Sequence, residues 1–194
     1  MTLFCSSSQK ATEAKWSRRR LLTLGGLAAA TYLAPRSVVA NPRHYTNPEK
    51  SLSLYNTHTG EGLKIVYWAE GHYVPEALAE VNHILRDHRA DETHVMDAQL
   101  LDLLFAMQRR LETRQPFHII SGYRSPATNA LLRQYSSGVA KNSLHIQGKA
   151  IDIRLPGRGL ATVRRVAVAL RKGGVGYYPD SNFIHLDTGS VRYW

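Results

Sequence analysis

The sequence predicts an α+β fold for residues 51–194, and three observations support this prediction. Helical patterns come early in the region, short strand-like segments gather towards its end, and strands and helices do not alternate regularly. Regular alternation would favour a doubly wound parallel sheet, whereas segregated elements favour an antiparallel sheet packed with helices. We therefore expect a small antiparallel sheet packed with helices.

The expected strands are short segments in which polar and apolar residues alternate, or short apolar runs between turn residues. They occur at 51–56, 63–68, 117–121, 150–154, 175–178 and 183–187. Turn residues at 58–62 separate the first two strands, so these two are expected to form a β-hairpin. The last two strands are joined by a turn at 179–182.

The expected helices are segments in which apolar residues recur every three or four positions. They occur at 75–88, 97–114, 127–133 and 160–172. Pro75 occupies an allowed early position in the first helix, and Asp97 is the expected N-cap of the second. Pro126 precedes the third helix, and Gly173-Gly174 is expected to close the fourth.

Residues 1–40 have the layout of a secretory leader. Adjacent arginines at 18–20 precede a short apolar run at 23–33, and small residues at 37–40 offer a cleavage site. The Arg-Arg-x-Leu-Leu pattern indicates the twin-arginine export machinery, which implies a periplasmic mature protein. An uncleaved anchor or a basic helix lying on the membrane is the alternative. Residues 41–50 are polar and contain two prolines, so they are expected to form a linker.

Charge and cysteine content narrow the classes of function. The chain carries 25 Lys and Arg residues against 15 acidic residues, but the leader holds six of the basic residues and one acidic residue. The remaining 19 basic and 14 acidic residues give a net charge of +5, which suits an anionic polymer such as a cell wall. The positive charges are scattered, so nucleic acid is not an expected partner. Cys5 is the only cysteine, and no segment after the leader is long and apolar enough for stable membrane insertion.

Two histidines and an aspartate form the candidate site. His145 stands seven residues before Asp152, and His185 follows 33 residues after Asp152 on a different expected strand. Alternation points Asp152 away from its apolar neighbours, and Gly148 permits a sharp return of the chain towards it. Three N and O ligands with one open position are what a catalytic zinc ion needs. The spacing alone is weakly specific, since a lone strand histidine is more often a core residue.

Three ordered motifs resemble those of the LAS-type zinc peptidases, a group of D-Ala-D-Ala carboxypeptidases, dipeptidases and murein endopeptidases. The motifs are Ser121-Gly-Tyr-Arg-Ser125, Ser143-x-His-x-x-Gly-x-Ala-x-Asp152 and Phe183-x-His-x-Asp-x-Gly189. The chain is most similar to the MepK-type murein endopeptidases, which also carry a twin-arginine leader. The resemblance implies a LAS, or hedgehog-like, peptidase fold over 51–194, and one Zn²⁺ per chain held by His145, Asp152 and His185.

The resemblance also implies roles for residues around the metal. Arg124 matches an arginine that holds the substrate carbonyl or the oxyanion, and Ser143 matches a substrate-binding serine. Tyr123 and Tyr177 are further candidates for substrate contact. Tyr177 or Tyr178 is also a candidate to stabilise the transition state, and simple strand packing is the alternative for these two tyrosines. The general base is left open.

The base is open because this chain departs from the family at the positions where relatives carry one. Asn182 stands where dipeptidases and carboxypeptidases have a glutamate, and Phe183 stands where other relatives have a histidine. Asp187 and Asp180 are the nearby carboxylates. Asp187 is expected to orient His185, and Asp180 is a candidate to reach the catalytic water.

The expected function is hydrolysis of peptide cross-links between the stem peptides of peptidoglycan by a periplasmic zinc endopeptidase. The resemblance implies the 3-3 link between two meso-diaminopimelate residues, and to a lesser extent the 4-3 link from D-Ala to diaminopimelate. A D,D-carboxypeptidase or dipeptidase is one alternative, which the missing glutamate at Asn182 disfavours. A zinc-dependent wall-binding module without catalysis is the other.

Overall fold

The structure, a computed structural model, describes residues 48–136 and 138–194. The expected leader at 1–40 and all but the last three residues of the expected linker at 41–50 lie outside the described residues. Within the described part, no helix combines the length and the apolar character that a membrane crossing requires.

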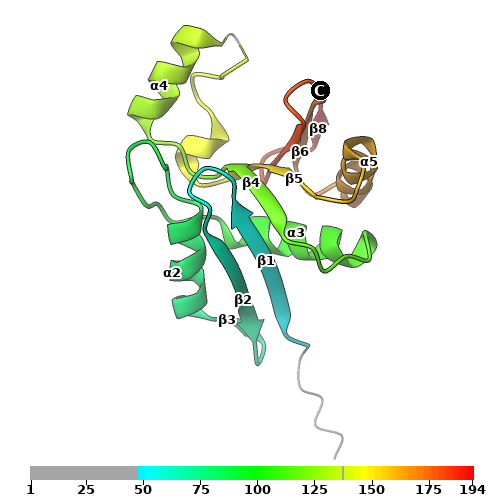
Figure 1. The fold of residues 1–194 in the computed structure, drawn as a ribbon. Coiled ribbons are helices and arrows are strands. Elements are labelled where there is room, and N and C mark those ends of the chain that lie inside the picture. Colours follow the sequence, from blue (N-terminus) through cyan, green and yellow to red (C-terminus); the bar gives the residue numbers. More distant parts are fainter. Residues whose placement is uncertain (1–47, 137) are drawn as a thin grey trace, which may run out of the picture. The chain divides into compact units, whose positions relative to one another are not determined.

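A single mixed sheet of eight strands runs through the described region in the order β3-β2-β1-β4-β5-β7-β6-β8 (Figure 1). The strands are β1 (Lys50–Asn56), β2 (Gly62–Ala69), β3 (His72–Tyr73), β4 (Phe117–Ser121), β5 (Ala150–Arg154), β6 (Gly174–Tyr178), β7 (Phe183–Asp187) and β8 (Arg192–Tyr193). The pairs β1–β4 and β6–β8 are parallel and the others are antiparallel. The α+β class is confirmed, but the sheet is larger than predicted and mixed.

Within residues 48–136 and 138–194, four α-helices and one short 3-10 helix accompany the sheet. They are α2 (Pro75–Ile84), α3 (Ala98–Arg110), α4 (Pro126–Tyr135), α5 (Leu160–Leu170) and the 3-10 helix η1 (Leu144–Gln147). Buried side chains of α2, α3 and α5 join the strands in one hydrophobic cluster, which forms the core. Figure 1 shows α4 projecting from the body of the fold above β4.

The helix termini follow local backbone chemistry. Asp97 caps α3 as predicted, because its side chain accepts a hydrogen bond from the backbone N–H of Gln99. The helix ends earlier than expected, at Arg110, and Glu112 then adopts a left-handed φ of 47°. Helix α5 also ends before the expected glycine pair, because Arg171 takes the left-handed conformation that closes it.

Strand alternation separates the core from the opposite face of the sheet. The side chains of Ile151, Ile153, Ile184 and Leu186 are fully buried in the core cluster. Since successive side chains of a strand point to opposite faces, Asp152 and His185 lie on the other face. The register pairs these two residues directly across β5 and β7. The sheet therefore presents a carboxylate and an imidazole side by side.

A polar cluster around Asp102 of α3 ties that helix to the first strands. Asp102 Oδ1 accepts hydrogen bonds from Lys50 Nζ (2.7 Å) and the Tyr67 hydroxyl (3.0 Å), and Oδ2 accepts one from the Tyr73 hydroxyl (2.8 Å). Burial raises the pKa of Asp102, but these three donors outweigh burial and hold it below its usual value. Burial and the neighbouring carboxylate raise the pKa of Tyr73 to about 12.

Replacing Asp102 with Asn is expected to lower the free energy of unfolding by about 2 kcal/mol at pH 7, since a charged hydrogen bond is lost. The folded-state pKa of Asp102 lies below the unfolded value of about 3.9, so its contribution is complete well above that pH. It is lost as the pH falls through the folded-state pKa. Urea denaturation from pH 7 to pH 3 should therefore show the two stabilities converging in acid. Asp180→Asn, at an exposed turn, is the control, and equal losses in both variants would contradict this role for Asp102.

Candidate metal centre

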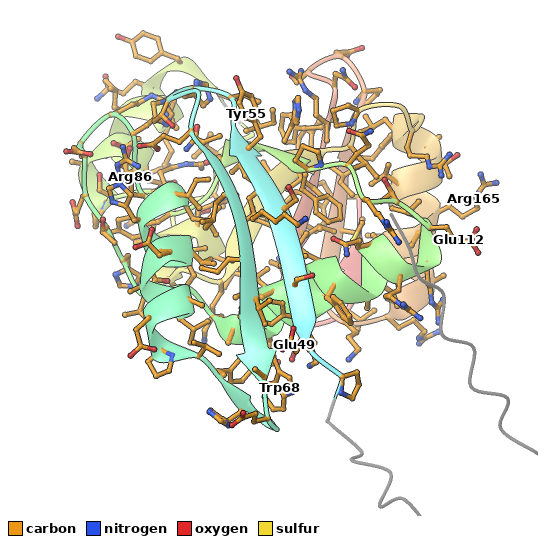
Figure 2. The ribbon with its side chains drawn as sticks, turned by 60° about the horizontal axis from the view of Figure 1, so that its bottom comes forward. Glu49, Tyr55, Trp68, Arg86, Glu112 and Arg165 are labelled. Carbon is orange, nitrogen blue, oxygen red and sulfur yellow. The ribbon has the colours of Figure 1, made fainter. Side chains whose placement is uncertain are left out.

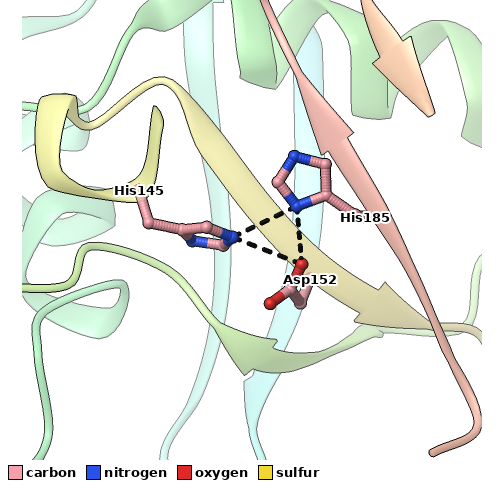
Figure 3. A group of neighbouring side chains, drawn as sticks. All are labelled: His145, Asp152 and His185. Carbon is pink, nitrogen blue, oxygen red and sulfur yellow. Dashed lines mark hydrogen bonds and ion pairs between the residues drawn. The ribbon is translucent and has the colours of Figure 1, made fainter. Parts of the chain in front are cut away.

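Three side chains from separate elements meet on the sheet face opposite the core (Figure 3). Asp152 comes from β5 and His185 from β7, while His145 reaches the same point from η1. The structure thus brings together the three residues predicted as ligands. His145 and Asp152 are buried, and the side chain of His185 is 12% exposed.

The short helix η1 aims His145 at the sheet. Its N-cap is Ser143, whose hydroxyl accepts from the backbone N–H of His145 (3.4 Å), and its C-cap is Gly148. Gly148 has a left-handed φ of 65°, and a Cβ there would clash with the carbonyl oxygen of Val95. The sharp return predicted at this glycine is therefore confirmed, and only glycine fits the close approach.

The three candidate ligand atoms are spaced as one face of a tetrahedron around a small cation. His145 Nε2 lies 3.2 Å from His185 Nδ1 and 3.3 Å from Asp152 Oδ1, and the last two atoms are 2.9 Å apart. Bonds of zinc length in tetrahedral geometry would separate ligand atoms by about 3.4 Å. The observed distances of 2.9 to 3.3 Å are close to this value, so the three atoms could hold a metal ion of this size.

The hydrogen bonds behind the histidines leave lone pairs facing the centre. His145 Nδ1 donates to the carbonyl of Gly122 (2.7 Å), so its Nε2 is free to bind a cation. His185 Nε2 donates to Asp187 Oδ2 (3.0 Å), so in the neutral ring Nδ1 keeps its lone pair for a cation. Two lone pairs and a carboxylate oxygen that converge in this way repel one another unless a cation or proton lies between them.

The carboxylates around His185 raise its pKa. Burial lowers the pKa of His185, but Asp152 and Asp187 more than offset burial and raise it to about 9. Burial likewise raises the pKa of Asp152, but the two histidines lower it by more than burial raises it. The pKa of Asp152 therefore lies well below its ordinary value, and the carboxylate is ionised at pH 7. The site is therefore a strong attractor for positive charge.

Asp187 anchors His185 from behind, in the position expected for an orienting carboxylate. It is fully buried and accepts hydrogen bonds from the backbone N–H groups of Gly174 (3.0 Å) and Gly189 (2.9 Å). The guanidinium of Arg192 donates to Asp187 Oδ1 (3.0 Å) and to Asp187 Oδ2 (2.7 Å). These four hydrogen bonds hold the carboxylate in place, and its Oδ2 accepts from His185 Nε2 and so fixes the orientation of that ring.

Arg124 reaches the site from the loop after β4. Its guanidinium lies 3.7 Å from Asp152 Oδ2 and 3.3 Å from the hydroxyl of Ser121, and its side chain is only 11% exposed. The Nε atom is buried without a hydrogen-bond partner among the described residues. Burial lowers the pKa of Arg124, although Asp152 acts in the opposite direction. This cation is desolvated and incompletely paired beside the candidate ligands.

The loop that carries Arg124 is held by backbone contacts. Tyr123 N–H donates to the carbonyl of Leu85 (2.7 Å), and Ser125 N–H donates to the buried Asp87 carboxylate (2.9 Å). Gly122 approaches Leu85 so closely that a Cβ would clash with its carbonyl oxygen. These contacts position Arg124 rigidly, as a preorganised site requires.

A cavity of about 370 Å³ opens over the three candidate ligands. Arg124, Ser143 and Tyr178 all line it, together with Trp194. The indole Nε1 of Trp194 donates to the hydroxyl oxygen of Tyr178 (2.8 Å). Because an indole only donates, the hydroxyl hydrogen of Tyr178 remains available to a group in the cavity. A guanidinium and a phenol therefore both offer hydrogen bonds beside the candidate metal site.

Three residues predicted to contact the substrate or the catalytic water do not line this cavity. Tyr123 is buried, its hydroxyl donates to Glu92 (2.9 Å), and its ring stacks on His94. Tyr177 pairs with Ile184 in the register, so it lies on the core face, where Arg164 stacks on its ring. Asp180 lies exposed in the turn before β7. The structure favours strand packing for Tyr177, and Tyr178 lines the cavity instead.

Two residues at the site escaped prediction from sequence. Arg192 clamps Asp187, and Trp194 packs so tightly over Gly176 that a Cβ there would lie 2.7 Å from the indole ring. Both belong to the end of the chain around β8, a strand of two residues. In the sequence, the only feature that could have pointed to them is the run of Arg192, Tyr193 and Trp194, and this run matches no motif or strand pattern.

Comparisons with known proteins place the chain in a family. A model of the family described as peptidoglycan L,D-endopeptidase MepK matches residues 44–194. The chain is 44% identical over 178 residues to a protein of that name from Escherichia coli strain K12, covering 92% of this chain and 97% of the relative. It is 43% identical over 179 residues to a probable MepK from Haemophilus influenzae, covering 92% of this chain and 95% of that relative. The chain therefore belongs to the MepK family of peptidases.

Proposed function

We propose that this protein is a zinc endopeptidase that hydrolyses peptide cross-links in peptidoglycan. The observation that carries the proposal is the convergence of three ligand atoms within 3.3 Å of one another, with Arg124 at the same cavity. The relatives named above are peptidoglycan L,D-endopeptidases, which supports the same substrate. Within this proposal, the bond is the 3-3 link between two diaminopimelate residues, with weaker cleavage of the 4-3 link.

His145, Asp152 and His185 are the proposed zinc ligands. Two imidazole nitrogens and one carboxylate oxygen suit zinc, and three protein ligands leave a fourth position open, as in catalytic zinc sites. When bound, zinc supplies a Lewis acid that polarises the cleaved carbonyl and lowers the pKa of water towards about 7. Asp187 fixes the orientation of His185, and the Gly122 carbonyl fixes that of His145.

Arg124 and Tyr178 are proposed to stabilise the oxyanion that forms when the carbonyl is attacked. Both line the cavity. Among the described residues, the two terminal nitrogens of Arg124 make one hydrogen bond each, to Asn129 and Ser121, so each keeps a further hydrogen, and the hydroxyl hydrogen of Tyr178 is also unused. The tight loop around Arg124 and the indole of Trp194 behind Tyr178 hold these donors in place before substrate arrives. Ser143 lines the same cavity and is proposed to bind the substrate backbone.

The cavity lining restricts which residues can act as the general base. Among the described residues that line the cavity, Asp152 is the only carboxylate, and His145 and His185 are the only imidazoles. Asp180 stays a candidate base only if the turn at 179–182 moves towards the cavity. This observation also favours the second candidate function, a zinc-dependent wall-binding module that does not cleave.

The proposed site of action is the periplasm. Support comes from the twin-arginine pattern at 18–22 and from the small residues at 37–40. Residues 1–40 are then the leader, 41–50 the linker and 51–194 the peptidase domain. The absence of cysteine after residue 40 fits export in a folded state, because no disulfide has to form after translocation.

Digestion of purified sacculi by residues 41–194 tests the proposal directly. With zinc, cross-linked dimers are expected to disappear and monomers to accumulate, and a chelator should abolish the change. Chromatography and mass spectrometry of the muropeptides identify the bond that is cleaved. Release of free D-Ala instead would favour a carboxypeptidase, and zinc-dependent binding to sacculi without any product would favour the binding module.

A further inference from the structure

A second cavity lies beside the candidate metal centre and has no role in the chemistry described above. It measures about 340 Å³ and lies between the end of β5 and the turn that precedes β7. His118, Arg154, Arg158 and Asn182 supply its polar lining. We refer to it as the arginine cavity.

The arginine cavity opens on the same sheet face as the metal site. Arg154 stands two positions after Asp152 in β5, so both side chains lie on one face, with about 6.8 Å between the two positions. The register pairs Arg154 with His118 of β4, which brings that histidine to the same face. The next pleat of the sheet beyond the metal ligands therefore carries a guanidinium and an imidazole.

The charge in the arginine cavity is positive and unbalanced. In residues 48–136 and 138–194, neither Arg154 nor Arg158 has a carboxylate within 4.0 Å, and the guanidinium of Arg154 has no hydrogen-bond acceptor. Arg158 donates to the carbonyl of Leu111 (3.0 Å), which holds it at the rim. Burial and the charge of Arg154 lower the pKa of His118, so this imidazole is neutral at pH 7 and adds no charge. A planar guanidinium without a partner is suited to a carboxylate.

We propose that the arginine cavity binds a free carboxylate of the peptidoglycan stem peptide, next to the bond that is cleaved. The inference rests on the proposed function, because it names a second contact of the same substrate. Stem peptides carry free carboxylates on D-glutamate and diaminopimelate, and an extended chain covers about 6.8 Å in two residues. A substrate held at the metal site can thus place a carboxylate against Arg154 while crossing the ring of Phe183, which lines the first cavity.

The test compares two soluble 3-3-linked dimers, one with free D-glutamate and diaminopimelate carboxylates and one with both kinds of carboxylate amidated. For the wild-type protein, KM is expected to be lower for the carboxylate form. Arg154→Gln should raise that KM about 10-fold, the scale of a lost charged hydrogen bond, and remove the preference between the dimers. The kcat should change less than twofold, because Arg154 does not contact the reacting carbonyl. Arg154→Lys should recover part of the preference.

Arg165→Gln is the matched control. Figure 2 shows Arg165 projecting from α5 at the edge of the molecule, and among the described residues its guanidinium bonds only to Thr162 of the same helix. This variant removes one positive charge from the protein but should leave both KM values unchanged. Equal KM shifts for Arg154→Gln and Arg165→Gln would show only a general effect of charge and would overturn the proposal.

A binding measurement separates failure of this proposal from failure of the proposed function. If the wild-type protein cleaves neither dimer, calorimetric titration with the same two dimers still measures the preference for carboxylate. Tighter binding of the carboxylate form, lost in Arg154→Gln, would uphold the subsite in a protein without catalysis. Cleavage of both dimers with equal KM would overturn the subsite while leaving the endopeptidase intact.

Discussion

Replacing His185 with Ala is expected to eliminate bound zinc and to lower cleavage of cross-linked dimers below detection. The imidazole supplies one of three converging ligand atoms, and two ligands cannot hold a catalytic zinc ion firmly. The change also leaves the fully buried carboxylate of Asp187 without its bond to the ring. Metal content by mass spectrometry and the rate on soluble dimers give independent readouts.

The control for this variant is a histidine of the same chain that lies away from the site. His72→Ala, on the exposed edge strand β3, should keep one zinc per chain and full activity. His145→Ala should behave like His185→Ala, since its Nε2 lies within 3.3 Å of both other ligand atoms. Full zinc content in either ligand variant would remove these residues from the metal site.

The strands that carry the proposed metal ligands could be predicted from sequence with correct limits. The expected strands at 117–121, 150–154 and 183–187 match β4, β5 and β7. Each is a short segment in which apolar residues are interrupted by two polar residues, and alternation then decides which face each side chain occupies. The convergence of Asp152 and His185 follows from this alternation together with antiparallel pairing.

The choice between Tyr177 and Tyr178 could not be made from sequence, because it depends on strand register. A shift of one residue in the pairing of β6 with β7 would exchange the faces of the two tyrosines. In the structure Gly176 pairs with His185, so Tyr178 faces the cavity and Tyr177 faces the core. The close packing of Trp194 over Gly176 favours this register. The sequence around these two residues does not indicate that they pack together.

The residues supporting the ligands were harder to predict because they depend on contacts between distant segments. Asp187 was identified because it lies two residues from His185 on the same strand. Its partner Arg192 follows a turn and belongs to a strand of two residues, which has no detectable pattern. The backbone carbonyl of Gly122, which orients His145, has no side chain to signal its role.

Replacing Arg124 with Ala is expected to lower kcat by about 100-fold to 1,000-fold, the usual effect of removing an oxyanion donor. Zinc should remain, because Arg124 lies 3.7 Å from Asp152 and contributes no ligand atom. Tyr178→Phe should lower kcat less, by about 10-fold, since a neutral hydroxyl offers a weaker hydrogen bond. Rates on soluble dimers and metal content distinguish these effects from loss of the metal.

The double variant tests whether the two donors act on the same oxygen. If Arg124 and Tyr178 both bind the oxyanion, the losses of transition-state stabilisation in the single variants should not add in the double variant. The reason is that each hydrogen bond to the oxyanion depends on the presence of the other donor. Arg124→Lys serves as the matched control, since it keeps the charge but loses the planar fork, and it should retain part of the rate. Strict additivity, or zinc loss in Arg124→Ala, would mean that Arg124 supports the fold of the site and does not contact the reacting carbonyl.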